Sequence, residues 1–159
     1  MSIRRLTPED KDLFVSIIQH PSVLPYIVDD YSSIQLYNMD AVLRIDTVYC
    51  LIYGEGVLFI LTPQNSITYD VHTCVLPQFR GEEAVSAARE GAEWMFKETN
   101  CQKITASFPV INSGAYALAR SIGMKKEGVN KKSFLRDGHL HDQIIMGLCK
   151  EDYLCQQQW

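Results

Sequence analysis

The most informative segment of the chain is Val75-Leu76-Pro77-Gln78-Phe79-Arg80-Gly81-Glu82-Glu83-Ala84. It follows an alternating segment, residues 67–75, which predicts a half-buried strand with its even-numbered residues on one face. It leads into a helix predicted to run to about Thr99, because small apolar residues recur there at helical spacing. The start of such a helix presents unpaired N–H groups and a positive dipole end, which together can hold a pyrophosphate.

Strands and helices alternate along most of the remaining chain. Residues 21–46, which contain Tyr26, Tyr31 and Tyr37, lack a long periodicity and predict loops with one or two short helical turns. The whole pattern indicates an α/β (α+β) layer fold built on a mixed sheet. Further strands are predicted at residues 2–6, 48–53, 57–61, 103–108, 124–135 and 139–148, and further helices at 8–20 and 112–122.

Length and composition limit the class of protein. The chain has 159 residues, of which 47% are hydrophobic, and this suits one domain with a sizeable core. We expect that domain to span residues 1–150, followed by a loosely held tail at 151–159. The net charge of −4 argues against non-specific nucleic-acid binding, which needs a basic surplus. No apolar run is long enough to cross a membrane and no secretory signal is visible, so we expect a cytoplasmic protein.

The cysteines do not indicate a metal site. No pair has the C-x-x-C spacing of a zinc knuckle or a redox motif, so we expect reduced thiols and no bound metal. The five cysteines are Cys50, Cys74, Cys101, Cys149 and Cys155.

Two motifs resemble those of the GNAT superfamily of N-acetyltransferases. Val75-x-Pro77-Gln78-x-x-Gly81 is similar to the acyl-CoA loop of that family, where a strand ends and a helix begins. Asn112-x-x-Ala115, followed by Gly123-Met124-x-x-Glu127-Gly128, resembles a second motif of the family. A match at two separated places is more specific than one motif alone.

A third motif resembles one branch of the same superfamily. Asp137-Gly138, followed by Asp142 and Met146-x-Leu148, is similar to the closing hairpin of the branch that acetylates the N-termini of ribosomal proteins. The resemblance implies a single-domain fold with a mixed central sheet of about six or seven strands flanked by helices. It also implies that the fourth and fifth strands splay apart.

The resemblance further implies that acetyl-CoA lies in the cleft between the splayed strands. The main chain of Cys74 and Val75 would pair with the pantetheine arm, and Asn112 would contact that arm from the side. Glu83 stands where the family has a second Gly or Ala, and Glu82 where Lys is common. Their carboxylates repel a pyrophosphate unless they turn to solvent, although acidic residues also favour a helix start. The amides that would face the pyrophosphate belong to Arg80, Gly81, Glu82, Glu83, Ala84 and Val85.

The proton-transfer groups depart from the family pattern. The N-terminal acetyltransferases often have a Glu five residues before the Asn, and here that position is Ser107, which cannot act as a base unaided. His72 is the best remaining base because its unperturbed pKa is near neutrality, and the alternative is a histidine with a purely structural role. The tyrosine that often serves the family as acid is replaced by Ala119. Tyr116, about one turn earlier, would need a different geometry to take that role.

Two functions from different classes therefore remain open. The first is an acetyl-CoA-dependent N-acetyltransferase that transfers the acetyl group to a primary amine of a protein or small molecule by direct attack. The second is a catalytically weak or inactive GNAT-fold protein used as a binding or assembly factor, with a protein partner or as a homodimer. Tailed-phage GNAT-like proteins look similar in the Arg-Gly-acidic loop and the closing hairpin. We favour the enzyme because backbone amides do most of the cofactor binding in such a loop.

Overall fold

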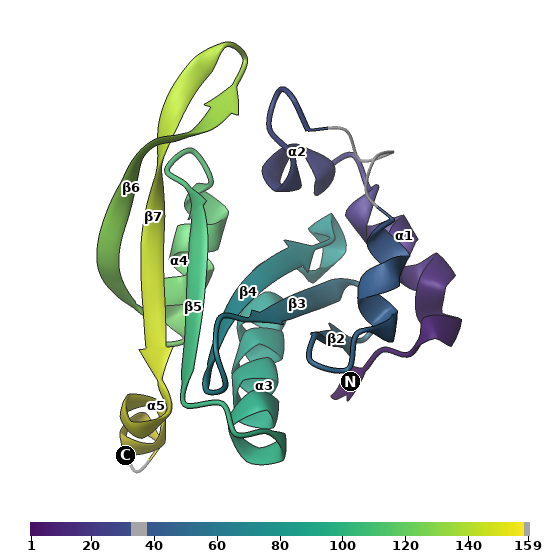
Figure 1. Cartoon of the computed structure of the whole chain (residues 1–159). Helices are drawn as coiled ribbons and strands as arrows, with labels where there is room; N and C mark the ends of the chain where they lie inside the picture. Colours follow the sequence, from purple (N-terminus) through teal and green to yellow (C-terminus); the bar gives the residue numbers. More distant parts are fainter. Residues whose placement is uncertain (33–37, 158–159) are drawn as a thin grey trace.

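The centre of the molecule is one seven-stranded mixed sheet with the strand order β1-β2-β3-β4-β5-β7-β6 (Figure 1). The computed structural model describes residues 1–32 and 38–157, so Tyr37 lies outside the described part of the chain. All neighbouring strands are antiparallel except β4 and β5, which are parallel. The α/β (α+β) prediction is confirmed. The strands are β1 (Ile3–Arg5), β2 (Tyr49–Tyr53), β3 (Val57–Pro63), β4 (Thr68–Val75), β5 (Lys103–Pro109), β6 (Lys125–Arg136) and β7 (His139–Cys149).

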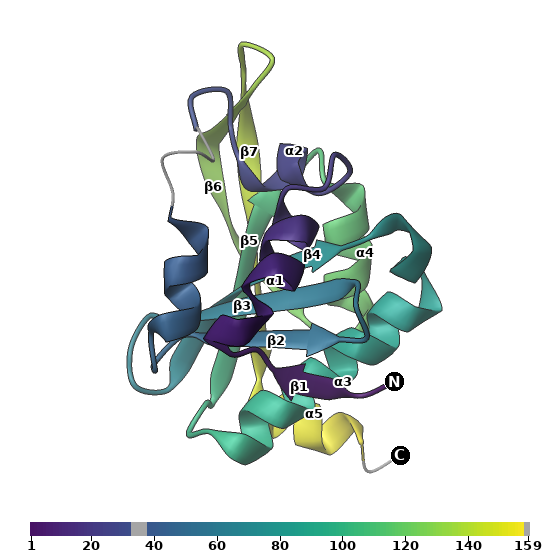
Figure 2. The same ribbon diagram turned by 90° about the vertical axis from the view of Figure 1, so that its right-hand side faces the viewer.

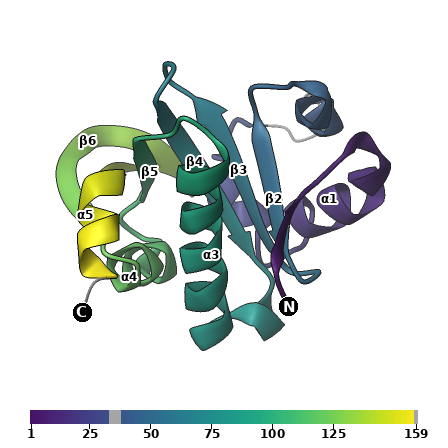
Figure 3. The same cartoon turned by 90° about the horizontal axis from the view of Figure 1, so that it is seen from below.

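Helices cover both faces of this sheet. Figure 3 shows α3 and α1 on opposite sides of β2 and β3, and Figure 2 shows α1 in front of these strands. Each face buries its own apolar cluster, one beneath α3 and α4 and the other beneath α1. The α-helices are α1 (Lys11–Ile18), α2 (Leu24–Ile27), α3 (Glu82–Glu98), α4 (Ser113–Ser121) and α5 (Lys150–Gln156), and the 3-10 helices are η1 (Pro8–Asp10), η3 (Met39–Arg44) and η4 (Pro77–Phe79).

Strand β4 shows how the sequence pattern assigns side chains to the two faces. Odd-numbered Tyr69 is buried in the cluster beneath α3, and even-numbered Cys74 is buried in the cluster beneath α1. This is the alternation that the sequence predicts, because successive side chains of a strand point to opposite faces. Asp70 and His72 therefore lie on the α1 side of the sheet.

The parallel pair β4 and β5 separates after a short stretch. The two strands pair only where Thr68–Asp70 meets Lys103–Thr105. Beyond that point β4 continues to Val75 and β5 to Pro109, and Figure 1 shows them diverging. The predicted splay of the fourth and fifth strands is confirmed.

The C-terminal segment differs from its prediction. Residues 150–156 form α5, and the Tyr153 side chain is only 4% exposed. Its ring packs on Phe96 with 5.4 Å between ring centroids, and its hydroxyl donates a hydrogen bond to the Arg89 carbonyl oxygen. The expectation of a loosely held tail is wrong for these residues, because one aromatic side chain anchors the helix to α3.

Candidate functional site

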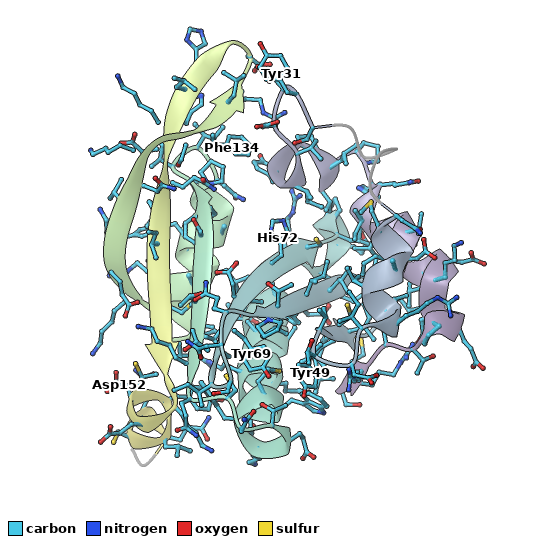
Figure 4. All side chains as sticks on the ribbon, viewed as in Figure 1. Tyr31, Tyr49, Tyr69, His72, Phe134 and Asp152 are labelled. Carbon is cyan, nitrogen blue, oxygen red and sulfur yellow. The ribbon has the colours of Figure 1, made fainter. Side chains whose placement is uncertain are left out.

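A cleft of about 1220 Å³ opens where β4 and β5 separate. Its walls come from β4 and β5, from α3 and α4, from the segment around α2, and from the β6–β7 hairpin. In Figure 4, His72 projects from β4 into this opening and Phe134 of β6 lies across from it. The cleft therefore lies between the two halves of the sheet, and side chains from both faces of the sheet line it.

A polar pair lies where β4 and β5 stop pairing, although neither residue is among those described as lining the cleft. Asp70 is the last residue of β4 that pairs with β5, and its partner is Thr105. The Thr105 hydroxyl donates a hydrogen bond of 2.8 Å to Asp70 Oδ1. Burial raises the pKa of Asp70, while this hydrogen bond and the nearby His72 oppose the rise. The carboxyl group thus marks the apex of the splay on the α1 side.

His72 stands one position further along the same face of β4 and lines the cleft. Its side chain is half-buried, and burial lowers its pKa below the ordinary 6.5, with Asp70 opposing part of the shift. The imidazole is therefore neutral at pH 7 and can accept a proton. Ser107 also lines the cleft from β5, on the same face of the sheet as Thr105. The structure thus brings His72 and Ser107 into one cavity.

The other end of the cleft is formed by the start of α3. This helix has 17 residues, and no side chain caps its first turn, so its free amide groups have no side-chain acceptor. Its N-cap is Gly81, which has a φ of 86° and a ψ of −133°. Among the predicted phosphate-facing residues, those that line the cleft are Arg80, Gly81, Glu82, Ala84 and Val85.

The charges near this helix start are mixed. Glu82 lines the cleft and is exposed, whereas Glu83 is half-buried and is not among the lining residues. Arg80 and Arg89 line the cleft as well, and with Glu82 and Asp29 the lining holds two guanidinium groups and two carboxylates. Arg80 donates a hydrogen bond of 3.3 Å to the carbonyl oxygen of Ser22, and Arg89 donates one of 3.3 Å to that of Ser121. The charged side chains of the lining are therefore balanced, and the free amides of α3 are the groups on this wall that suit an anion.

The edge of β4 supplies main-chain groups to the cleft. Cys74 and Val75 pair with β3 on one side, while β5 has already diverged on the other. The main-chain groups that point away from β3 therefore face the cleft. The Cys74 side chain is buried beneath α1, and burial raises the pKa of its thiol to about 12, so this thiol is unreactive at neutral pH.

Asn112 has a structural role as well as a place in the cleft. It is the N-cap of α4, and its Oδ1 accepts a hydrogen bond of 3.1 Å from the amide of Ala115. It also lines the cleft. Because one carbonyl oxygen serves the cap, the amide group of Asn112 keeps its N–H donors available for a ligand.

The structure places Tyr116 outside the cleft. Its ring packs against Phe108 with 6.5 Å between centroids, and the guanidinium of Arg120 lies 5.8 Å from the ring centroid. It is absent from the described lining residues, whereas Ala119 is buried and lines the cleft. The geometry thus gives no support to Tyr116 as a proton donor, because its ring belongs to the packing of α4 on β5.

A set of hydrogen bonds joins the tip of the β6–β7 hairpin to α2 and the residues that follow it, and sequence reasoning missed it. The Asp30 carboxylate accepts hydrogen bonds of 2.9 and 2.8 Å from the amides of Asp137 and Gly138 at the tip of the β6–β7 hairpin. The Asp30 amide donates a bond of 3.0 Å to the carbonyl oxygen of Leu135. Arg136 donates in return to main-chain carbonyl oxygens beside α2. Figures 1 and 2 both show the hairpin tip beside the segment that follows α2. We call this set of bonds the clasp.

Within residues 1–32 and 38–157, no three or more His, Cys, Asp or Glu side chains are grouped so that they could hold a metal ion. In the same part of the chain, no helix is both long and apolar enough to cross a membrane.

The sequence has one curated relative of weak similarity, and no family model matches it. The relative is the uncharacterized N-acetyltransferase YnaD of Bacillus subtilis (strain 168), which is 26% identical over 87 residues. These residues make up 54% of this chain and 51% of the relative, so the chain spans about half the length of the protein that it matches.

Solved structures are similar over nearly the whole chain. The ribosomal-protein-S5-alanine acetyltransferase from Vibrio fischeri has a TM-score of 0.75 at 15% identity, covering 95% of this chain and 93% of that one. The spermidine N-acetyltransferase from Vibrio cholerae, in complex with CoA and spermine, has a TM-score of 0.77 at 19% identity, covering 96% and 97%. A GNAT-family acetyltransferase from Bacillus anthracis has a TM-score of 0.72 at 20% identity, covering 94% of each chain. These similarities establish the fold.

Proposed function

We propose that this chain, which has the fold of the GNAT N-acetyltransferases, transfers the acetyl group of acetyl-CoA to a primary amine of a protein or small molecule. One observation carries the proposal. The cleft between β4 and β5 has an uncapped helix start at one end and a neutral, half-buried His72 on the opposite face of the sheet. The names of the similar proteins support it, since one of them is an N-acetyltransferase bound to CoA and spermine.

The residues of the cleft suit two parts of a CoA molecule, the pyrophosphate and the pantetheine arm. The free amides at the start of α3 suit the pyrophosphate, with Arg80 and Arg89 adding positive charge to the same wall. The unpaired edge of β4 at Cys74 and Val75 suits the amide groups of the pantetheine arm. Asn112 lines the cleft from the start of α4 and can donate to the same arm. Bound in this way, acetyl-CoA supplies an activated thioester at the splay of the sheet.

His72 is the proposed general base. It takes a proton from the acceptor ammonium, and the free amine then forms the N–C bond as the C–S bond of the thioester breaks. The half-buried Asp70, which accepts the hydrogen bond from Thr105, stabilises the imidazolium that results. Ser107 lies on the same side of the sheet and is placed to hold the amine or a bridging water by hydrogen bonding. In this role it positions the acceptor and needs no proton transfer of its own.

Loss of the family tyrosine at Ala119 does not prevent this reaction. A thiol has an ordinary pKa near 8.5, so it can leave as the thiolate without a dedicated acid. The nitrogen loses a second proton as the amide forms, and this proton neutralises the thiolate directly or through solvent. The ammonium proton taken up by His72 is released to solvent, so atoms and charges balance. Removing a positioned acid costs roughly 100-fold or more in rate in typical enzymes, so we expect slow turnover.

Ala119 also favours the second candidate function, a GNAT-fold protein that binds CoA or a protein partner with little chemistry. It is buried at the position where the family carries its acid, and the described lining residues hold only one tyrosine, Tyr26. Measurable acetyl transfer would exclude this alternative. Tight CoA binding without transfer would favour it.

The proposed function is tested by incubating the protein with acetyl-CoA and a panel of amines. The panel contains peptides with free N-termini, lysine peptides and polyamines. Products are detected by mass spectrometry, because the exposed Cys155 would react with a thiol reagent used to follow CoA release. We expect at least one amine to gain one acetyl group, and a panel with no acetylated product would contradict the enzyme.

The His72→Ala variant tests whether His72 acts in proton transfer without contributing to acetyl-CoA binding. We expect this variant to lose about 100-fold or more in turnover while its affinity for acetyl-CoA stays within two-fold of the native value. Ser107→Ala is the matched comparison on the neighbouring strand, and it should lose less because Ser107 transfers no proton. Equal turnover of His72→Ala and the native protein would remove His72 from the mechanism.

A further inference from the structure

The loop that leads into α3 is seated on the turn between β2 and β3. The Phe79 ring lies directly over Gly56, where a Cβ atom would overlap Cδ2 and Cε2 of the ring and would lie 2.9 Å from its Cγ. The same ring covers Gly54, whose Cβ position is 3.1 Å from Cε1. Two glycines in one short turn thus leave a flat surface for one aromatic side chain.

Main-chain hydrogen bonds tie the loop to the same turn. The Leu76 amide donates a bond of 2.9 Å to the carbonyl oxygen of Gly56, and the Phe79 amide donates one of 2.9 Å to that of Leu76. Two residues after Phe79 the chain reaches Gly81, the N-cap of α3. A shift of the Phe79 ring would therefore move the peptide groups at the start of the helix.

We infer that Phe79 and Gly56 are positioning residues for the pyrophosphate of CoA. The Phe79 ring, held against Gly56, fixes the loop of residues 77–81 so that the first amides of α3 point into the cleft. Neither residue lines the cleft, so their effect passes through the loop. The inference rests on the proposed function, because it concerns the same ligand.

The geometry separates this role from general packing. Phe79 is half-buried at the rim of the apolar cluster beneath α3, and Gly56 belongs to a hairpin turn, so neither lies at the centre of the core. An added methyl group at Gly56 cannot be accommodated without moving the ring. Because the ring lies between Pro77 and Gly81, its movement displaces the loop.

The test compares CoA with S-acetylpantetheine, which keeps the pantetheine arm with its sulfur acetylated. Binding of CoA and of S-acetylpantetheine, which lacks the pyrophosphate and the nucleotide, is measured by calorimetry on the native chain, Gly56→Ala and Phe79→Ala. We expect the Kd for CoA to rise at least about ten-fold in both variants, the loss expected when one charge-assisted hydrogen bond no longer forms. The Kd for S-acetylpantetheine should stay within two-fold, because the edge of β4 is unchanged.

Two control variants show whether the effect is specific. Gly128→Ala adds the same methyl group on β6, where it would lie 3.8 Å from Ile145 Cδ1, an ordinary contact, and it should bind CoA as the native chain does. Phe79→Tyr keeps the ring and should retain native affinity. Circular dichroism and a thermal melt on each variant establish that it is folded.

The outcomes distinguish the inference from the proposed function. Native-like CoA binding by a folded Phe79→Ala would overturn the inference alone. An equal loss of affinity for both ligands would also overturn it, since the residues would then support the whole cleft and not the phosphate loop. Failure of the native chain to bind CoA would contradict the proposed function itself, and the inference with it.

Discussion

Replacement of Gly81 by alanine tests whether the backbone conformation at the start of α3 is needed for binding CoA. Gly81 has a φ of 86° and a ψ of −133°, a backbone conformation that L side chains rarely adopt. A Cβ added there meets no atom within 4 Å, so the substitution introduces no steric clash with the rest of the protein. Its whole cost is backbone strain, which is roughly 1–3 kcal/mol for a residue held in such a region.

The strain can appear in either of two measurements. If residue 81 keeps its conformation, the free energy of unfolding falls by that amount, and Tm falls by about 2–4 °C for each kcal/mol. If the loop rotates to relieve the strain, the first amides of α3 turn away from the cleft and stability is kept. The Kd for CoA then rises by about 5- to 150-fold, since 1–3 kcal/mol corresponds to that range. The loss in the free energy of unfolding and the loss in the free energy of CoA binding should together equal the strain energy.

The assay pairs calorimetry with thermal unfolding on the ligand-free protein. Gly128→Ala provides the reference, because the backbone of Gly128 is not in the positive-φ region. We expect Gly81→Ala to lose stability, CoA affinity or both relative to this reference. A variant with Tm within 1 °C and Kd within two-fold of the native values would refute the reasoning.

Three further predictions concern other parts of the molecule. Burial holds the pKa of His72 below 6.5. As the pH is lowered, turnover should therefore fall only below pH 6.5, where protonation of His72 also favours the unfolded chain. A rate that already falls while the pH is lowered towards 7 would contradict the role of His72. Asp30→Ala removes the acceptor of the clasp, so hydrogen exchange at the amides of Asp137 and Gly138 should accelerate while CoA affinity is unchanged. Met95 is 0% exposed, so Met95→Ala should cost roughly 2–5 kcal/mol in a urea titration, and a loss below about 1 kcal/mol would mean that its site is not packed.

Much of the sheet was predictable because its strands carry strong local patterns. The alternation of residues 67–75 assigned His72 and Cys74 to the same face, and the structure has this arrangement. The Asp137-Gly138 turn between the last two strands was equally clear, because that dipeptide suits a tight hairpin. Local pattern was enough in both cases, since each element is defined within about ten residues of sequence.

The clasp and the C-terminal helix had no such signal. Asp30 meets the hairpin tip across more than 100 residues of sequence, and only the fold brings the two together. The helix α5 lacks a side-chain cap, and two contacts hold it against α3: the buried Tyr153 ring and the hydrogen bond from Lys150 Nζ to the Phe96 carbonyl oxygen. The seating of Phe79 on Gly56 is hidden for a similar reason, because a glycine in a turn has many uses and the sequence does not say what covers it.

Calorimetric titration of the purified protein with acetyl-CoA and with CoA tests directly whether the cleft between β4 and β5 binds this cosubstrate. The account predicts micromolar binding of both, because the free amides of α3 and the unpaired edge of β4 offer the main-chain groups that the ligand needs. Such binding would also mean that Glu82 turns to solvent when the pyrophosphate enters. Absence of heat at millimolar ligand would contradict the account and leave the cleft without a CoA-binding role.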